Sequence, residues 1–382
     1  MEDDISLHDE LTARLLEHTA IMAVTGYEGP IADAVEHHYR QRGDDTRRIG
    51  HSLVVRPPPS PFAASAAPTD RPLVLLVGHL DVVAPTQDDE TPRVEGRDGM
   101  TLVVARGASD MKSGNVVAMS LFERDDLRAT GRFDLGLILY AGEEGPADGN
   151  ELASVLDTNP ELSTAALAIV LEPTDGRVEL GCLGGLHARL TFHGQQAHSA
   201  RPWQGDNALT AAARFLVALS DADVVDVTVD DVDYRDVWTA TQAWTDQTTG
   251  RNVVPGHCTV NLNFRFAPSR SIEEAERELR ERVAAVADRR VDIQIIDRAP
   301  PASPRRYSAA VAEFVDAAIA AGGTVSGKQA WTDVARFAEI GVPALNFGPG
   351  LTGQAHQRGE YVPIDAMVAA YTTLERFLSQ DA

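Results

Sequence analysis

The sequence has very few cysteines and lysines. Among its 382 residues there are only two cysteines, Cys182 and Cys258, and only two lysines, Lys112 and Lys328. The two cysteines stand far apart and form no C-x-x-C pair, which excludes a disulfide framework and a thiolate zinc site of the structural kind. Long hydrophobic runs are also absent, because none approaches the roughly 18–20 residues that a membrane-spanning helix needs.

Positive charge is scarce as well. The chain carries 34 basic and 57 acidic side chains, giving a formal net charge of −23. Such a chain lacks the basic surface that binds nucleic acid phosphates or an anionic membrane, so neither is an expected partner. The first residues, MEDDISLHDE, lack the basic and apolar regions of a signal peptide, and we expect a cytoplasmic protein.

Four short apolar runs predict the core of the fold. They cover residues 71–80, 135–140, 166–171 and 343–347. Continuous apolar runs of this length are typical of strands that are buried on both faces of a mostly parallel sheet. Helical stretches separate them, at 7–42 (interrupted before Pro30) and 114–126. This order predicts an α/β fold.

The pattern changes between the third and fourth runs. Residues 186–193 and 259–266 alternate polar and apolar side chains, which indicates strands with one exposed face, and 291–296 reads as a further strand. Helices are predicted at 207–219 and 271–287, the second opened by a Ser271–Glu274 capping box. We therefore expect a small α+β domain at 184–297, inserted into a first domain made of 1–183 and 298–382.

Histidines and carboxylates follow the apolar runs. Active sites of α/β sheets gather beyond the carboxyl ends of the strands, and histidine nitrogen and carboxylate oxygen are zinc ligands. A pair of ions about 3.5–4 Å apart also needs a bridging carboxylate. The pattern thus favours a paired divalent-metal site, without the H-E-x-x-H or G-x-S-x-G motifs of other hydrolases. The candidates are His79, Asp81, Asp110, Glu143, Glu144, Glu172 and His356.

Each of these groups has an ordinary alternative when taken alone. His79 also fits a hydrogen-bonded core histidine, and Asp110 fits a helix cap. Glu143 and Glu144 fit a solvated acidic turn. Their joint occurrence at strand ends, rather than any single residue, favours the metal hypothesis.

Five segments resemble one known family. They are GHLDVV (78–83), ARGASDMKSG (105–114), AGEEG (141–145), EPT (172–174) and the late His356. In this order, over nearly the whole chain, they resemble the di-zinc deacylases and carboxypeptidases, which include succinyl-diaminopimelate desuccinylases, acetylornithine deacetylases, aminoacylases and carboxypeptidase G. The resemblance implies a zinc-peptidase-like catalytic domain with a mostly parallel sheet. It also implies that the insert is a ferredoxin-like lid and dimerisation domain.

The resemblance also implies a ligand set for two zinc ions. One ion would be held by His79 and Glu172, the other by Glu144 and His356, with Asp110 bridging them. The second position would also accept Co²⁺ or Mn²⁺. The family further implies a cis peptide bond after the bridging aspartate.

Catalytic and substrate-binding roles carry over in the same way. Glu143 would be the general base, Asp81 would orient the metal-binding His79, and His198 from the lid of a partner subunit would stabilise the oxyanion. The implied substrate contacts are Asn252, Arg265, Arg201 and Thr332. A small anionic N-acyl amino acid is the implied substrate, and a homodimer through the lid the implied assembly.

Within the family, the closest resemblance is to actinobacterial succinyl-diaminopimelate desuccinylases. It rests on stretches such as EPTDGRVELGCLGGL, AHSARPWQGDNAL and AWTDVARF. Cys182 and Leu183 depart from it, because some desuccinylases have arginines there and use one to bind substrate. The expected reaction is hydrolysis of N-succinyl-LL-2,6-diaminopimelate to succinate and LL-2,6-diaminopimelate, in lysine and cell-wall biosynthesis. An acetylornithine-type deacylase or a small-peptide carboxypeptidase remains the alternative.

Overall fold

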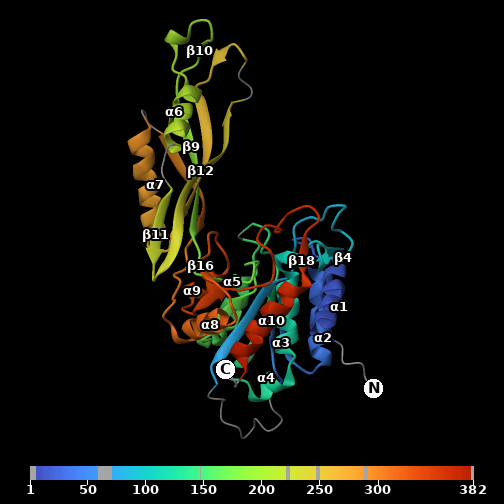
Figure 1. Ribbon diagram of the computed structural model, residues 1–382. Helices are drawn as coiled ribbons and strands as arrows, with labels where there is room; N and C mark the ends of the chain where they lie inside the picture. The colour runs from blue at the N-terminus through green and yellow to red at the C-terminus, as the bar shows by residue number, and fades with distance from the viewer. Residues whose placement is uncertain are drawn as a thin grey trace. The chain divides into compact units, whose positions relative to one another are not determined.

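The computed structural model describes residues 6–58, 71–146, 148–220, 224–246, 250–287 and 291–379 (Figure 1). The chain divides into two compact units. The first comprises Met1–Leu180, Arg305–Ser326 and Arg336–Ala382, and the second comprises Gly181–Pro304 and Gly327–Ala335. The first unit is therefore discontinuous in sequence. Within the described residues, no helix is long and apolar enough to cross a membrane.

An eight-stranded sheet forms the centre of the first unit. Its order is β1-β2-β6-β3-β7-β17-β8-β16, and the inner pairs β6–β3, β3–β7 and β7–β17 are parallel. The four apolar runs become these inner strands, which confirms the predicted α/β fold. The bounds are β1 (Asp45–Ile49), β2 (Ser52–Arg56), β3 (Leu73–His79), β6 (Asp134–Tyr140), β7 (Leu167–Val170), β8 (Val178–Leu180), β16 (Val325–Gly327) and β17 (Ala344–Asn346).

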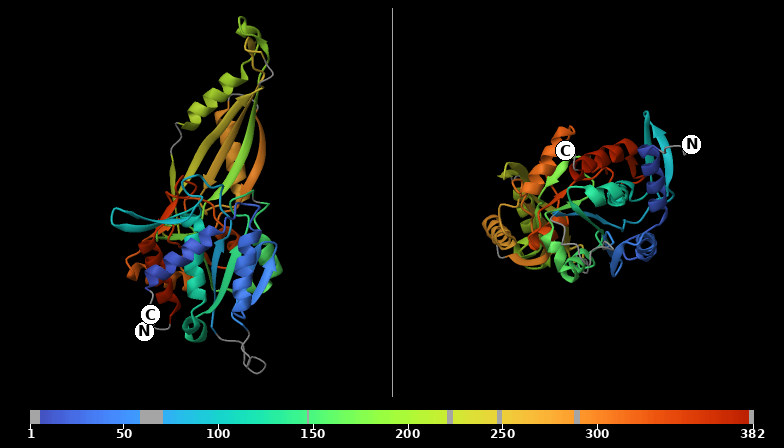
Figure 2. Two further views of the ribbon diagram at one scale, coloured as in Figure 1. Left: turned by 90° about the vertical axis from the view of Figure 1, so that its right-hand side faces the viewer. Right: turned by 90° about the horizontal axis from the view of Figure 1, so that it is seen from below.

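Helices cover both faces of this sheet, as the view from below shows (Figure 2). This cover explains why every residue of β3 is buried. A separate three-stranded sheet, β18-β5-β4, lies in the same unit. The helices are α1 (Leu7–Ala20), α2 (Gly29–Gln41), α3 (Ser113–Phe122), α4 (Asp125–Thr130), α5 (Leu152–Thr158), α8 (Ala309–Ala320), α9 (Val334–Glu339) and α10 (Ile364–Leu378), and the small strands are β4 (Arg93–Arg97), β5 (Met100–Val104) and β18 (Tyr361–Pro363).

The helix predicted at 114–126 differs from the observed one. Helix α3 ends at Phe122, because Arg124 adopts an extended conformation, and α4 starts at Asp125. All ten residues of α3 are buried, not only one apolar side. The reason is that α3 packs on β3 and β6 with one face while α1 and α10 cover the other.

The carboxylate of Glu123 connects three helices of this unit through hydrogen bonds. It follows the last residue of α3 and accepts two hydrogen bonds from Arg14 of α1, at 2.8 and 2.9 Å. His38 and Tyr39 of α2 contact the same carboxylate at 3.0 and 3.1 Å. Burial alone would raise the pKa of Glu123, but the hydrogen bonds with His38 and Arg14 and their charges outweigh burial and lower the pKa to about 2.

This carboxylate predicts an acid-dependent loss of stability. Unfolded glutamate binds a proton near pH 4.5, whereas folded Glu123 binds one only near pH 2, so its stabilisation is complete above about pH 5 and is lost as the pH falls toward 2. We expect Glu123→Gln to lower the free energy of unfolding by roughly 2–3 kcal/mol at pH 7, with a smaller difference from wild type at pH 3–4. Denaturant titrations at several pH values measure this difference.

Glu10→Gln is the matched control. Glu10 faces the same Arg14 at 3.6 Å, but about half of its side chain is exposed, and exposed pairs contribute little. A stability difference for Glu123→Gln that does not shrink in acid would contradict the interpretation.

The second unit is a five-stranded antiparallel sheet with two helices on one face. The order is β11-β12-β14-β9-β15. Helices α6 and α7 pack against strands β9, β12, β14 and β15 of this sheet. The bounds are β9 (Gly184–His193), β11 (Val225–Val229), β12 (Val232–Thr245), β14 (His257–Phe266), β15 (Val291–Ala299), α6 (Ala208–Ser220) and α7 (Ile272–Val286).

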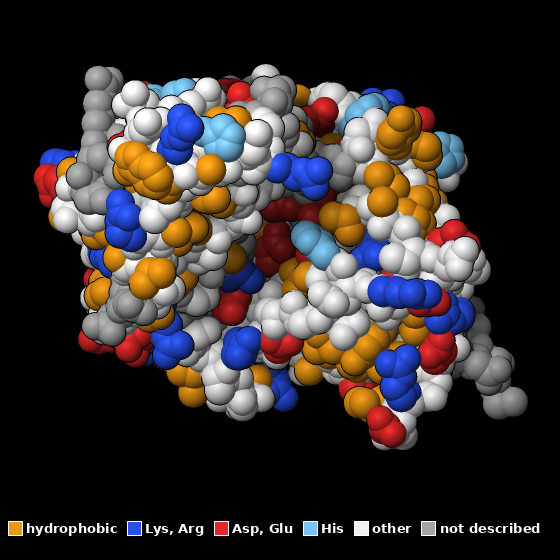
Figure 3. All heavy atoms as spheres, turned by 90° about the horizontal axis from the view of Figure 1, so that it is seen from above, with side chains coloured by type: hydrophobic (Ala, Val, Ile, Leu, Met, Phe, Trp, Pro, Cys, Tyr) orange, Lys and Arg blue, Asp and Glu red, His pale blue; other side chains and the backbone are white. Residues whose placement is uncertain are grey.

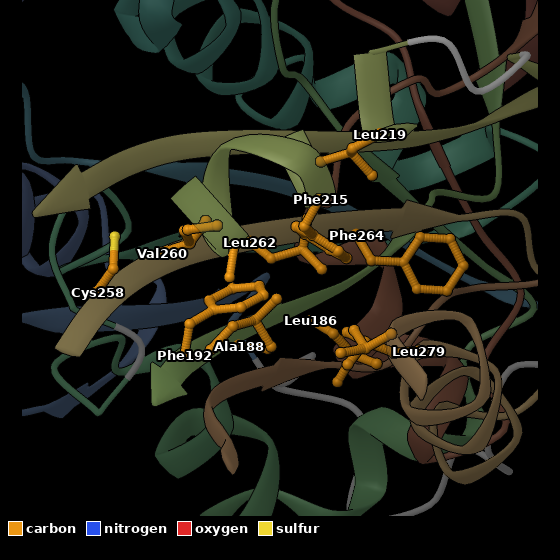
Figure 4. Close-up of a cluster of buried hydrophobic side chains, with 14 of the residues drawn as sticks. Leu186, Ala188, Phe192, Phe215, Leu219, Cys258, Val260, Leu262, Phe264 and Leu279 are labelled. Atoms are coloured by element: carbon orange, nitrogen blue, oxygen red, sulfur yellow. The ribbon is translucent and has the colours of Figure 1, made fainter. Parts of the chain in front are cut away.

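The core of this unit follows from alternation along its strands. In β9, Leu186, Ala188, Leu190 and Phe192 are buried, while the residues between them are partly or fully exposed. The buried side chains meet those of β14, α6 and α7 in one apolar cluster (Figure 4). The capping box at Ser271 is present as predicted. Strands β11 and β12 are not predicted from the sequence. Val225–Val229 alternates but is short and mostly exposed, and along Val232–Thr245 the alternation breaks down after Asp236.

Candidate metal centre

Parallel strands of the first unit bring the predicted ligands to one edge of the sheet. His79 is the last residue of β3, and Glu144 and Glu172 follow the ends of its neighbours β6 and β7. Because parallel strands end at the same edge, residues more than 60 positions apart in sequence meet there. His356 lies in the segment between β17 and β18.

The His79 ring is held in a defined tautomer. Its Nδ1 lies 2.9 Å from the main-chain oxygen of Asp81, which can only accept, so Nδ1 carries the hydrogen. The other nitrogen, Nε2, then presents a lone pair 3.3 Å from Oδ1 of Asp110. Two electron-rich atoms at this distance need a cation between them, either a proton or a metal ion. Asn115 fixes the strand end by donating from Nδ2 to the His79 carbonyl at 2.6 Å.

The charges around His79 also favour a bound cation. Burial alone would lower the pKa of His79, but the hydrogen bond with Asp110 and the charges of Glu143 and Glu172 outweigh burial and raise the pKa well above its ordinary value. The imidazole is completely buried. A surplus of carboxylates around one buried ring therefore favours a bound positive charge.

Asp110 lies in the turn that precedes α3. This turn, Ala108–Lys112, follows Gly107, whose φ of 81° is in the left-handed region that glycine adopts readily. The Asp110–Met111 peptide bond is cis, as the family resemblance implied. The turn places the Asp110 carboxylate between two histidines: Oδ1 is 3.3 Å from Nε2 of His79 and Oδ2 is 3.6 Å from Nε2 of His356.

The remaining ligand candidates complete the cluster. Ligand atoms of His79, Asp110 and Glu144 all lie within 4.8 Å of one another. His356 Nε2 lies 2.8 Å from Oε2 of Glu144. Burial is the main cause that raises the pKa of Glu144 to about 7, and Asp110 adds to it. Figure 3 shows acidic side chains beside a histidine on the face seen from above.

These donors fit a divalent metal centre. Imidazole nitrogen and carboxylate oxygen are zinc ligands, and Asp110 has one oxygen near each histidine, which is the arrangement of a bridge. A bound cation would also favour the charged form of Glu144, whose pKa burial raises. Glu172 is buried just beyond the end of β7, and its negative charge is one of those that raise the pKa of His79.

Asp81 is expected to orient the His79 ring, but its carboxylate makes its closest contacts with other groups. Its carboxylate is 3.7 Å from the His79 ring, while its main-chain oxygen makes the close contact. The carboxylate instead accepts the main-chain N–H groups of Glu143 and Glu144, at 3.1 and 3.0 Å, and the hydroxyl of Thr25 at 3.0 Å. Asp81 therefore holds the segment that carries both glutamates, in addition to fixing the histidine through the backbone.

The other predicted site residues belong to the second unit, where they form two groups. His198 pairs with Val253 in the short ladder of β10 (Ala197–His198) and β13 (Val253–Val254). Its main-chain oxygen accepts from the N–H of Arg201 at 2.8 Å. The main-chain oxygen of Asn252 accepts from Ser199, also at 2.8 Å. His198, Arg201 and Asn252 thus form one loop cluster.

Arg265 and Thr332 form the second group. Arg265 lies opposite Gly185, near the start of β9, and burial lowers its pKa. The main-chain oxygen of Thr332 accepts from the thiol of Cys182 at 3.7 Å. Thr332 is buried, and the structure places it beside the residues that precede β9.

One buried carboxylate next to the site is not predicted from the sequence. Glu360 is almost completely buried and contacts the turn that carries Asp110. A signal was available, because Arg106 is the second residue of the ARGASD motif, and a buried arginine requires carboxylate partners. Those partners are Glu360 and Asp89, at 3.0 and 3.1 Å.

Comparisons with known proteins place the chain in a family. The model of Peptidase family M20/M25/M40 matches residues 75–380. The chain belongs to this family of metal-dependent peptidases and amidohydrolases, which confirms the resemblance seen in the motifs.

Individual relatives of the chain include deacylases and a peptidase. The chain is 33% identical over 376 residues, covering 97% of this chain and 95% of the other, to the succinyl-diaminopimelate desuccinylase of Corynebacterium glutamicum. It is 29% identical over 316 residues to the acetylornithine deacetylase of Myxococcus xanthus, covering 80% and 79%. Among solved structures, aminopeptidase PepT of Bacillus cereus shares the fold, with a TM-score of 0.76, 17% identity, and 97% and 98% of the two chains covered.

Proposed function

We propose that this chain is a zinc-dependent amidohydrolase that converts N-succinyl-LL-2,6-diaminopimelate to succinate and LL-2,6-diaminopimelate in the cytoplasm. The cluster of His79, Asp110 and Glu144 carries the proposal of metal-dependent hydrolysis. The substrate is supported by the similarity, over 97% of the chain, to a desuccinylase.

The donor set is consistent with two zinc ions. His79 and Glu172 would hold one, Glu144 and His356 the other, and Asp110 would bridge them. Zinc in such a site polarises the amide carbonyl and makes water a stronger nucleophile. The second position would also accept Co²⁺ or Mn²⁺.

The chain's own residues would move the protons. Glu143 is the proposed general base: its carboxylate takes a proton from the attacking water and returns it to the nitrogen of the leaving amine. Its position is supported by the hydrogen bond from its N–H to Asp81, at 3.1 Å. Nε2 of His198 would donate a hydrogen bond to the oxygen that becomes negative during the reaction, since Nδ1 accepts from the N–H of Ala200.

Substrate recognition supports a homodimer. The proposed contacts in the second unit lie near opposite ends of β9: Arg265 pairs with Gly185 at one end, while Gly194 beyond the other end binds Gly256, close to the His198 ladder. The ten extended residues of β9 span about 30 Å. A single small amino acid derivative cannot bridge that distance. If both groups contact one substrate, His198 and Asn252 come from one subunit, and Arg265 and Thr332 from the other.

A second substrate has support of its own. Cys182 and Leu183 stand where some desuccinylases have arginines, and the chain is also similar to an acetylornithine deacetylase. Arg265 and Arg201 would still supply positive charge for a carboxylate of the acyl group. The alternative is therefore a deacylase of another N-acyl amino acid or a small-peptide carboxypeptidase with the same metal chemistry.

Hydrolysis of a substrate panel tests the proposal. Zinc-loaded protein is expected to release succinate from N-succinyl-LL-2,6-diaminopimelate with a kcat/KM at least about a hundredfold above that for N-acetylornithine or dipeptides, a gap of roughly 3 kcal/mol in transition-state binding. A metal chelator should abolish the activity and added zinc restore it. Preference for acetylornithine or dipeptides would select the alternative, and full activity in chelator would contradict the metal mechanism.

A further inference from the structure

The turn that carries Asp110 is built around a carboxylate from far along the chain. Oε1 of Glu360 accepts the main-chain N–H groups of Ser109 and Asp110, at 2.8 and 2.9 Å. Oε2 accepts the N–H of Gly107 at 2.9 Å and a guanidinium N–H of Arg106 at 3.0 Å. One side chain therefore receives four hydrogen bonds from four residues of the stretch 106–110.

This arrangement is an anion-binding nest that is filled by the protein itself. Successive main-chain N–H groups in a turn with a left-handed residue converge on one point and favour a negative charge there. Gly107 supplies the left-handed residue, with φ of 81°. In nucleotide-binding loops a phosphate occupies such a nest, whereas here the occupant is Glu360, which is only 1% exposed.

A second carboxylate fixes the occupant. Arg106 bonds Glu360 with one guanidinium nitrogen and Asp89 with the other, at 3.0 and 3.1 Å. Asp89 also accepts the N–H of Gly359 at 2.8 Å, next to Glu360 in sequence. All three charged side chains are buried. Breaking either ion pair would leave an uncompensated buried charge, which is costly and keeps both pairs formed.

We propose that Glu360 is a positioning residue for metal binding, which acts through Asp110. By holding the N–H groups of residues 107, 109 and 110, it fixes the backbone from which the Asp110 carboxylate reaches both His79 and His356. Without this anchor the turn would have to be ordered when metal binds, and that ordering costs affinity. The inference rests on the proposed role of Asp110 as the bridging ligand.

The test is zinc affinity of Glu360→Gln. Glutamine keeps the shape but replaces one acceptor oxygen with an NH₂ group, which would face N–H groups of the turn. We expect its zinc affinity, measured by competition with a chromophoric chelator, to fall about 10–100-fold. The visible spectrum of the Co²⁺-loaded variant should also differ from wild type, because the bridging carboxylate is displaced.

Glu123→Gln is the matched control. It is the same substitution in the same unit, at a carboxylate that also receives several hydrogen bonds from charged and polar side chains, and Glu123 belongs to the α1–α2–α3 contact rather than to the metal cluster. It should lower stability but leave zinc affinity and the Co²⁺ spectrum unchanged. A general loss of stability would affect zinc binding in both variants equally.

The outcomes separate this inference from the proposed function. Wild-type zinc affinity and an unchanged Co²⁺ spectrum in Glu360→Gln, or an equal loss in Glu123→Gln, would overturn the role of Glu360 while leaving the metal centre intact. Wild-type protein that holds no zinc would overturn the metal centre itself. If Glu360→Gln does not fold, Glu360→Asp keeps the charge but shortens the reach. The zinc affinity of Glu360→Asp should then fall by less than the loss expected for Glu360→Gln. A zinc affinity equal to that of wild type would contradict the inference.

Discussion

Glu143→Gln is expected to reduce kcat by about 10²–10⁴ while the protein keeps its metal. The reason is that the amide cannot accept the proton from water, whereas the proposed ligands are left untouched. Steady-state kinetics on N-succinyl-LL-2,6-diaminopimelate, together with metal analysis by mass spectrometry of the same sample, measures both quantities. The hydrogen bond from the main chain of residue 143 to Asp81 does not involve the altered side chain, so the segment should stay in place.

The adjacent glutamate provides the control. Glu144 contacts His356 at 2.8 Å and lies in the cluster with His79 and Asp110, so Glu144→Gln should lose metal as well as activity. The two substitutions are chemically identical and one residue apart, and only their positions relative to the metal differ. Normal turnover in Glu143→Gln would remove Glu143 from the mechanism.

His198→Ala is expected to slow turnover by about 10²–10³ without loss of zinc. A donor to a developing oxyanion typically contributes about 2.7–4 kcal/mol, which corresponds to this change in rate. His198 is exposed, and within the described part of the chain its Nδ1 accepts a hydrogen bond from the nearby N–H of Ala200, at 3.0 Å. Its removal should therefore cost little stability, and thermal unfolding of the variant provides the control.

Mixing two inactive variants tests where His198 acts. In a hybrid dimer of Glu143→Ala and His198→Ala subunits, one of the two sites has both groups intact if His198 acts across the interface. Random exchange of subunits would then restore up to about a quarter of wild-type activity. Each variant incubated alone is the control. A mixture no more active than its components, although subunit exchange is demonstrated by a labelled subunit, would contradict action in trans, as would a fully active monomer in light scattering.

The sequence by itself determined the fold class and most candidates of the metal centre. Apolar runs such as 135–140 and 166–171 have no polar face and the length of a strand, which is typical of interior strands in a parallel sheet under helices. Charged residues directly after such runs, such as Glu144 and Glu172, are costly to bury without a partner. Their positions in the chain therefore point to chemistry before any contact is known.

Only the tertiary structure decided how these residues are held. Glu360 lies about 250 positions from the turn that it fixes, and the intervening segments that set its position obey no local pattern. The same holds for Asp81, whose carboxylate binds the segment of Glu143 and Glu144 rather than the His79 ring. Periodicity records which face of an element is buried, whereas hydrogen bonds between distant segments depend on distances that exist only once the chain has folded.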